Sequence, residues 1–267
     1  MRPSPAAALV ISVLLTSTLA PLPYAAAQAR PSGEWTLTPL RETGRASGRV
    51  QLTLTRDAGS SVSGNSVELR RFEGLTAAQA ASGSGPARFR LPGEAGTLSF
   101  DGEFRGGRGM GEFTFTPDPA FAAALERRGV GRPTANEQLR LTLRGTRLAG
   151  VDEYLAELRA AGSARPDVAG LIRALNHDVT VAYVRELAAA GYRGLGTEQL
   201  VRLRNHRVDA AFIHGLRAAG YAGLSTDELV RLHNHGVTPE LARRANAGRP
   251  ERLSVHQLVR MRNHGLL

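Results

Sequence analysis

The sequence lacks two residue types altogether: it contains no cysteine and no lysine. The absence of cysteine excludes disulfides, thiol catalysis, thiolate metal sites and a membrane anchor on a lipidated cysteine. Without lysine, all 34 basic residues are arginines, and against 24 acidic residues they give a net charge of +10. Two origins of this arginine excess are open: codon bias in a GC-rich genome, and selection for guanidinium contacts to carboxylate or phosphate. Either origin predicts a surface that attracts polyanions at low salt.

Residues 1–29 have the pattern of a signal peptide. Arg2 supplies the positive charge, residues 6–20 form the apolar stretch, and Ala27-Gln28-Ala29 fits a cleavage site. The apolar stretch runs into Pro21 and is shorter than the roughly 20 residues that a membrane helix needs. No later segment is apolar enough to cross a membrane. The sequence therefore predicts an extracytoplasmic protein, periplasmic or secreted, with no transmembrane segment after removal of the leader.

Residues 30–117 alternate apolar and polar side chains, as in Trp35-Thr36-Leu37, which is typical of strands with one buried face. Glycine-rich turns separate six or so such strands, and residues 76–81 read as a short helical turn. This region is predicted to form a small antiparallel β-meander domain. Its expected core consists of Trp35, Leu37, Val50, Leu52, Leu54, Val67, Leu69, Phe89, Leu91, Leu98, Phe100, Phe104, Phe113 and Phe115.

Residues 118–267 contain a repeat, because four histidines recur every 29 residues at the end of phrases such as Leu200-Val-Arg-Leu-Arg-Asn-His206. A fixed period of this length indicates stacked supersecondary units. Each unit reads as an αα-hairpin: helix A ends at a glycine such as Gly191, and helix B begins at a capping box such as Ser225 with Glu228. The predicted fold class is α+β with segregated halves, the β domain being followed by a short α-solenoid. The predicted copies are 118–150, which is degenerate, 151–178, 179–207, 208–236 and 237–267.

Helix B carries the same three residue types in every clear copy, and we call these sets the arginine, asparagine and histidine ladders. Separations of three and four residues place them on one helix face. The histidines are not expected to bind a metal, because packed helices lie ~8–10 Å apart whereas zinc ligands lie ~2 Å from the ion. The ladders are Arg173, Arg202, Arg231 and Arg260; Asn176, Asn205, Asn234 and Asn263; and His177, His206, His235 and His264.

Two interpretations of the ladders remain open. In the structural one, asparagine and histidine end helix B, since asparagine tolerates the left-handed conformation and histidine suits the negative end of the helix dipole. The arginines are then solvated or pair with acidic residues inside the array. In the functional one, the ladders dock an acidic strip of a partner. The candidate partner-binding residues are Arg173, Arg202, Arg231, Arg260, Asn205, Asn234, His206 and His235.

The phrase at 220–237, Gly-Tyr-Ala-Gly-Leu-Ser-Thr-Asp-Glu-Leu-Val-Arg-Leu-His-Asn-His-Gly-Val, resembles helical repeats in uncharacterised bacterial exported proteins. It is also similar to repeats in the C-terminal regions of some β-lactam-sensor-type membrane metallopeptidases. The strand segments at 95–104 and 111–117 are similar to the front half of such proteins. The resemblance implies a family and no activity, because the metallopeptidase motif His-Glu-x-x-His is absent.

The array and the lack of a catalytic constellation favour an exported, non-enzymatic binding or adaptor protein that holds a protein partner and needs no cofactor. Asp101 and Glu103 form a carboxylate pair by spacing, but they fall on the solvent side of their strand. An alternative is arginine-rich binding of a polyanion such as a cell-envelope polymer; the leader disfavours intracellular nucleic acid. A minor alternative is a hydrolase with a site in the β domain or at the junction of the two halves.

Overall fold

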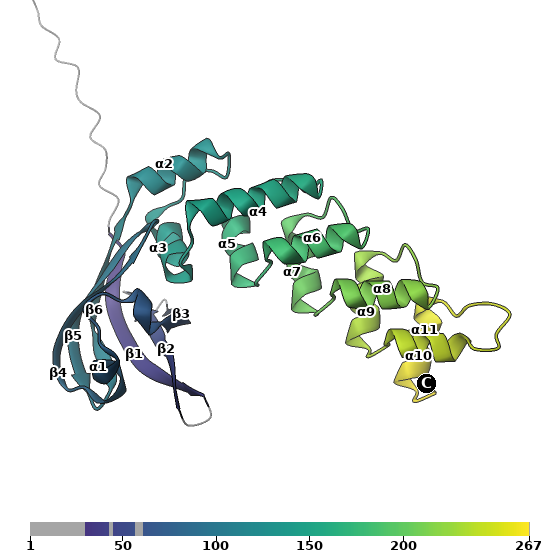
Figure 1. Ribbon diagram of the computed structural model, residues 1–267, viewed down its shortest axis with the longest axis horizontal. Helices are drawn as coiled ribbons and strands as arrows, with labels where there is room; N and C mark the ends of the chain where they lie inside the picture. Colours follow the sequence, from purple (N-terminus) through teal and green to yellow (C-terminus); the bar gives the residue numbers. More distant parts are fainter. Residues whose placement is uncertain (1–29, 43–44, 57–60, 267) are drawn as a thin grey trace, which may run out of the picture.

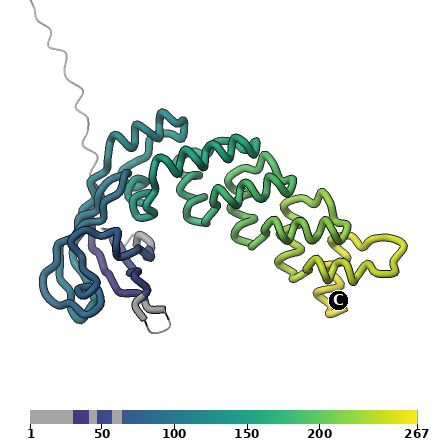
Figure 2. The backbone as a smooth tube through the Cα atoms, in the orientation of Figure 1, coloured from purple at the N-terminus to yellow at the C-terminus, as the bar shows by residue number. Residues whose placement is uncertain are grey.

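The structure, a computed structural model, describes residues 30–42, 45–56 and 61–266, and the predicted signal peptide lies outside them. Within these residues, six strands form one antiparallel sheet and ten helices follow it in a row (Figure 1). This confirms the predicted α+β class, in which a sheet precedes a helical array. The helical row extends away from the sheet as an arch, and the C-terminal end lies far from the strands (Figure 2).

The sheet consists of two three-stranded meanders joined at their first and last strands, so it differs from the single meander expected. Its strand order is β3-β2-β1-β6-β5-β4, and β1 pairs antiparallel with β6. Glycine makes this central pairing possible: a Cβ atom added at Gly109 in β6 would lie 2.6 Å from the ring of Trp35. The strands are β1 (Ser32–Glu42), β2 (Arg45–Thr55), β3 (Ser61–Glu68), β4 (Gly85–Gly93), β5 (Gly96–Arg105) and β6 (Arg108–Pro117).

The alternating apolar side chains form the core of the sheet as predicted, except that Leu69 is only half-buried. Trp35 lies at the centre, with edge-on ring contacts to Phe89 at 5.1 Å and to Phe100 at 5.7 Å. The short helix α1 (Ala77–Ser82) packs on the sheet and begins at a capping box between Thr76 and Gln79. A 3-10 turn, η1 (Leu69–Arg71), follows β3.

The helices form five αα-hairpins arranged in two layers (Figure 1). Successive A helices contact one another, as α4 does α6, and successive B helices do the same, as α5 does α7. The A helices are α2 (Pro119–Arg127), α4 (Leu148–Ala160), α6 (Val181–Ala189), α8 (Ala210–Ala218) and α10 (Pro239–Asn246). The B helices are α3 (Ala135–Arg144), α5 (Val168–Asn176), α7 (Thr197–Asn205), α9 (Thr226–Asn234) and α11 (Val255–Asn263).

Local signals set the helix ends where the sequence predicted them. Asp118 accepts hydrogen bonds from the first turn of α2, and Pro119 occupies its first position. Helix α6 ends with Gly191 at a φ of 98°, and the next backbone N–H bonds to the Leu187 carbonyl at 2.9 Å. The apolar side chains between these ends are buried in one continuous core, Leu203 among them.

The first hairpin joins the two halves of the molecule, because α3 contributes to both cores, with Leu141 packed in the core of the array. Phe121 in α2 packs in the core of the array, whereas Leu139 and Leu143 in α3 pack in the core of the sheet. Helix α4 also begins at Leu148, three residues before the predicted copy boundary. Its first N–H donates to the Glu94 carboxylate of the β4–β5 turn at 2.7 Å. A cap supplied by a distant turn leaves no local trace in the sequence.

Candidate functional site

The three ladders lie at the C-terminal ends of the B helices. The expectation that asparagine takes the left-handed conformation there is wrong. Asparagine is the last helical residue and histidine the C-cap, but neither takes the left-handed conformation. The following residue does so: Asp178, Arg207, Gly236 and Gly265 have φ between 52° and 68°. The reason is the closing hydrogen bond of this helix end, such as that from the Val208 N–H to the Leu203 carbonyl at 3.0 Å, which reverses the chain one residue after the histidine.

The asparagine and histidine ladders bond to each other between successive copies. Nδ1 of His177 lies 2.7 Å from Oδ1 of Asn205, and His206 lies 2.8 Å from Asn234. The third bond joins His235 to Oδ1 of Asn263 at 2.9 Å. Because the amide oxygen only accepts, these bonds need the proton on Nδ1. Four of the candidate partner-binding residues, Asn205, Asn234, His206 and His235, therefore link neighbouring B helices to one another.

The arginine ladder changes character along the array. Arg173 pairs with Glu198, and Arg202 pairs with Asp227, so in the first two rungs the guanidinium contacts a carboxylate of the next copy. In the last copy the equivalent acidic position is occupied by His256. Arg231 therefore has no ion pair or side-chain hydrogen bond with any of the described residues. Arg260 has none either, and both arginines are exposed.

Other arginines serve the fold by capping helices of the preceding copy. Arg193 donates to the Ala160 carbonyl at 2.5 Å, and Arg217 and Arg252 donate to carbonyls at the ends of α6 and α8. Cations at the C-terminal ends of helices also complement the helix dipole. Part of the arginine excess is thus structural.

A second kind of contact lies beside the ladders on the same helices. The Arg204 guanidinium lies 5.2 Å from the ring centroid of Tyr183, and His233 makes an edge contact with Phe212 at the equivalent place one copy later. Burial raises the pKa of the Tyr183 hydroxyl. Smaller effects come from the charge of Arg204, which lowers this pKa, and from that of Asp209, which raises it. The tyrosine stays neutral at ordinary pH, so this contact is a cation over an aromatic ring rather than an ion pair.

Two members of the ladders were missed in the degenerate first copy. When the Thr134–Glu137 capping box of α3 is aligned with the cap of α7, Arg140 falls at the arginine position and Arg144 at the histidine position. Arg144 indeed donates to Oδ1 of Asn176 at 3.1 Å, as the histidines do in later copies. The capping box was the signal that could have found both residues.

Within the described residues, no group of three histidine, aspartate or glutamate side chains is arranged to hold a metal ion. The helices found there are also too short or too polar to span a bilayer. Comparisons of the chain with protein families, with curated proteins and with solved structures find no match. The resemblance to exported bacterial proteins and to metallopeptidase repeats therefore stays a prediction.

Proposed function

We propose that the protein is an exported, non-enzymatic binding protein that holds an acidic protein partner on the B-helix side of its array. The observation that carries this proposal is the change in the arginine ladder. Arg173 and Arg202 are occupied by carboxylates of the next copy, whereas Arg231 and Arg260 are exposed and unpaired among the described residues. Arginines at the repeated position are thus left available in the last two copies, and Arg140 at the same position of the first copy is likewise exposed and unpaired among the described residues.

The geometry of two free rungs suits an acidic helix or strip. Successive packed helices lie ~8–10 Å apart, and residues seven apart on a helix are separated by about 10.5 Å. Two carboxylates with that spacing can each meet one guanidinium in a two-pronged contact. The bond between His235 and Asn263 joins the two helices that carry these arginines, which fixes the spacing of their backbones before binding.

An anionic cell-envelope polymer is the second candidate ligand, favoured by the charge of the last copy. Residues 237–267 contain six arginines and two glutamates, a net charge of +4. Phosphate or carboxylate groups along a polymer would bind such a surface without a specific register. Binding of this kind weakens steeply as salt rises because counterions are released, so a salt titration separates it from a docked protein partner.

Crosslinking of the full chain in cell-envelope extract tests the proposal. The double variant Arg231→Glu/Arg260→Glu should lose a partner that the wild type captures. The matched control Arg127→Glu/Arg159→Glu makes the same charge change on exposed A-helix residues and should retain it. If both variants lose the partner equally, the interaction is general charge attraction. If both retain the partner, the binding face lies elsewhere on the protein.

A gain-of-pairing variant sharpens the test. His256→Asp places a carboxylate where Asp227 stands one copy earlier, so Arg231 should become paired within the array. Partner capture should then weaken while the melting temperature stays the same or rises. Unchanged capture would show that the free Arg231 is not part of the interface. Turnover in a broad esterase, glycosidase and peptidase panel would contradict the non-enzymatic part of the proposal.

A further inference from the structure

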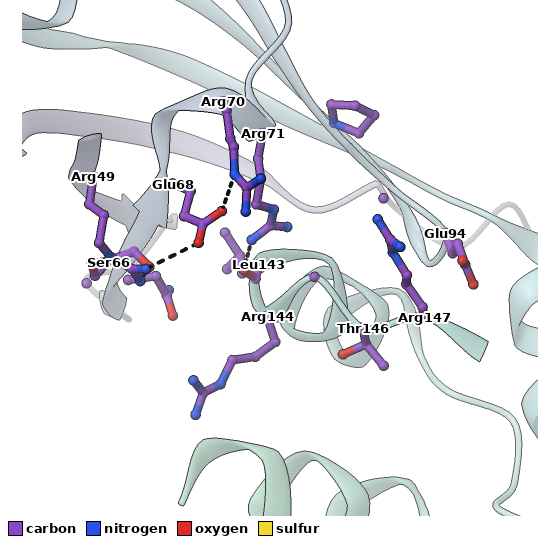
Figure 3. Close-up of a pocket in the computed structure, with 15 residues that line it drawn as sticks. Arg49, Ser66, Glu68, Arg70, Arg71, Glu94, Leu143, Arg144, Thr146 and Arg147 are labelled. Atoms are coloured by element: carbon purple, nitrogen blue, oxygen red, sulfur yellow. Dashed lines mark hydrogen bonds and ion pairs between the residues drawn. The ribbon is translucent and has the colours of Figure 1, made fainter. Parts of the chain in front are cut away.

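A cleft with a cavity volume of about 1240 Å³ lies where the sheet meets the first hairpin (Figure 3). We call it the junction cleft. It is separate from the free rungs of the arginine ladder, and its walls come from β2, β3, η1, the β4–β5 turn and the α3–α4 loop. Five arginines line it: Arg49, Arg70, Arg71, Arg144 and Arg147.

Two of these arginines are held by the fold. Arg71 donates to the Leu143 carbonyl at 2.8 Å and to the Thr142 carbonyl at 2.6 Å, which caps the end of α3. Its pKa is lowered mainly by burial; Glu68 opposes this, and Arg147 and Arg49 add to it. Arg144 donates to the Leu175 carbonyl at 2.5 Å and reaches the second hairpin. Positively charged side chains thus lie together in the junction cleft, although the Arg71 guanidinium is partly buried.

The carboxylates of the cleft are already engaged. Glu68 lies 2.7 Å from Nε of Arg70 and 3.7 Å from Arg49, and the hydrogen bond from Arg70 lowers its pKa. Glu94 accepts the first N–H of α4. Five arginines against two glutamates leave a net charge of +3 in the cleft. The Arg147 side chain has no hydrogen bond or ion pair with any other described residue.

We propose that the junction cleft binds a ligand through two or more phosphate groups. Arg70 and Arg71 lie on one side of the cleft and Arg147 on the other (Figure 3). A tetrahedral phosphate accepts hydrogen bonds from several directions, whereas a planar carboxylate favours donors in its own plane. Arg144 pairs with Asp178 at 3.9 Å, so the lining keeps two positive charges without a carboxylate partner. Guanidinium groups on both walls can each donate to one of two linked phosphates.

Titration calorimetry of the full chain with inorganic pyrophosphate tests this assignment. The variant Arg147→Gln removes a side chain that supports no other contact, so the fold should be unchanged, and binding should weaken at least about ten-fold. Arg159→Gln is the matched control, because Arg159 is exposed in the last turn of α4, the helix that Arg147 precedes. The control should bind pyrophosphate within about two-fold of the wild type, which is within the usual scatter of a neutral surface change.

Two further ligands identify the source of the phosphate. Vesicles of phosphatidylglycerol report on lipid headgroups, and tighter binding to vesicles than to pyrophosphate, lost in Arg147→Gln, would support the site and assign it to a lipid. Citrate tests for carboxylate binding. The proposal is overturned if citrate binds as tightly as pyrophosphate, if Arg147→Gln and Arg159→Gln weaken binding equally, or if pyrophosphate binding is absent or insensitive to Arg147→Gln.

Discussion

Two tyrosines at equivalent positions of the repeat should respond in opposite ways to the same substitution. Tyr154 in α4 and Tyr183 in α6 are 5% and 4% exposed. The Tyr183 hydroxyl donates to the Val208 carbonyl at 2.7 Å. The Tyr154 hydroxyl oxygen is buried and has no hydrogen-bond partner among the described residues. Replacement by phenylalanine therefore removes a hydrogen bond in one copy and an unsatisfied buried polar atom in the other.

The magnitudes follow from these two environments. Tyr183→Phe should lower the free energy of unfolding by ~1–1.5 kcal/mol, since a buried hydrogen bond is lost and a carbonyl loses its partner. Tyr154→Phe should raise it by ~1 kcal/mol, because the cost of burying a lone hydroxyl disappears. In a chain of this size the melting temperatures should move in opposite directions by roughly 2–4 °C. Equal destabilisation by both variants would refute the reasoning, because it would require a hydrogen bond at Tyr154.

Four further predictions concern the array. Leu203→Ala should lower the free energy of unfolding by ~2–5 kcal/mol because Leu203 is fully buried. Arg202→Ala should change it by less than ~0.5 kcal/mol, because the Arg202 side chain is 52% exposed. Thermal melts of the two variants compare these effects. Asn234→Ala should cost ~0.5–1.5 kcal/mol in urea unfolding, because it removes a bond between copies. Arg207→Gly should raise the urea midpoint, since the φ of 54° at this position strains a residue with a side chain. Burial raises the pKa of Tyr154 from 10.0 to about 12, because the folded state favours the neutral hydroxyl. The free energy of unfolding should therefore fall as the pH rises from 10 to about 12, where the unfolded chain ionises first. Urea unfolding over that range should show a smaller decline in Tyr154→Phe than in the wild type.

The sequence predicted those features that each segment determines by itself. Alternation predicted the strands because one face of the sheet is buried, and Trp35 and Leu37 lie where it placed them. Capping boxes predicted the starts of B helices, since the cap residue and its partner are three residues apart. The glycine at Gly236 was also a local signal for the left-handed residue, although the asparagine two positions earlier was given that role.

Features that depend on distant partners could not be predicted. The pairing of β1 with β6 depends on how Gly109 fits against Trp35, which no local pattern reveals. Leu139 and Leu143 have the spacing of an ordinary helix face, yet they pack in the sheet instead of the array. The junction cleft is assembled from four separate stretches of the chain, and its arginines are spread from residue 49 to residue 147. Only the folded chain brings their charges together.

Repetition itself has two physical causes, and the ladders separate them. A contact between one copy and the next can recur along the array when the same residue types recur, so a bond such as His206 to Asn234 produces a repeated ladder with no ligand involved. A ligand needs only that the side chains remain free. The arginine ladder meets the first condition at Arg173 and Arg202. It meets the second at Arg231, where His256 replaces the acidic residue of the preceding copies, and at Arg260. In a stacked array, a binding surface is therefore best sought where the repeat pattern is broken and its self-pairing ends.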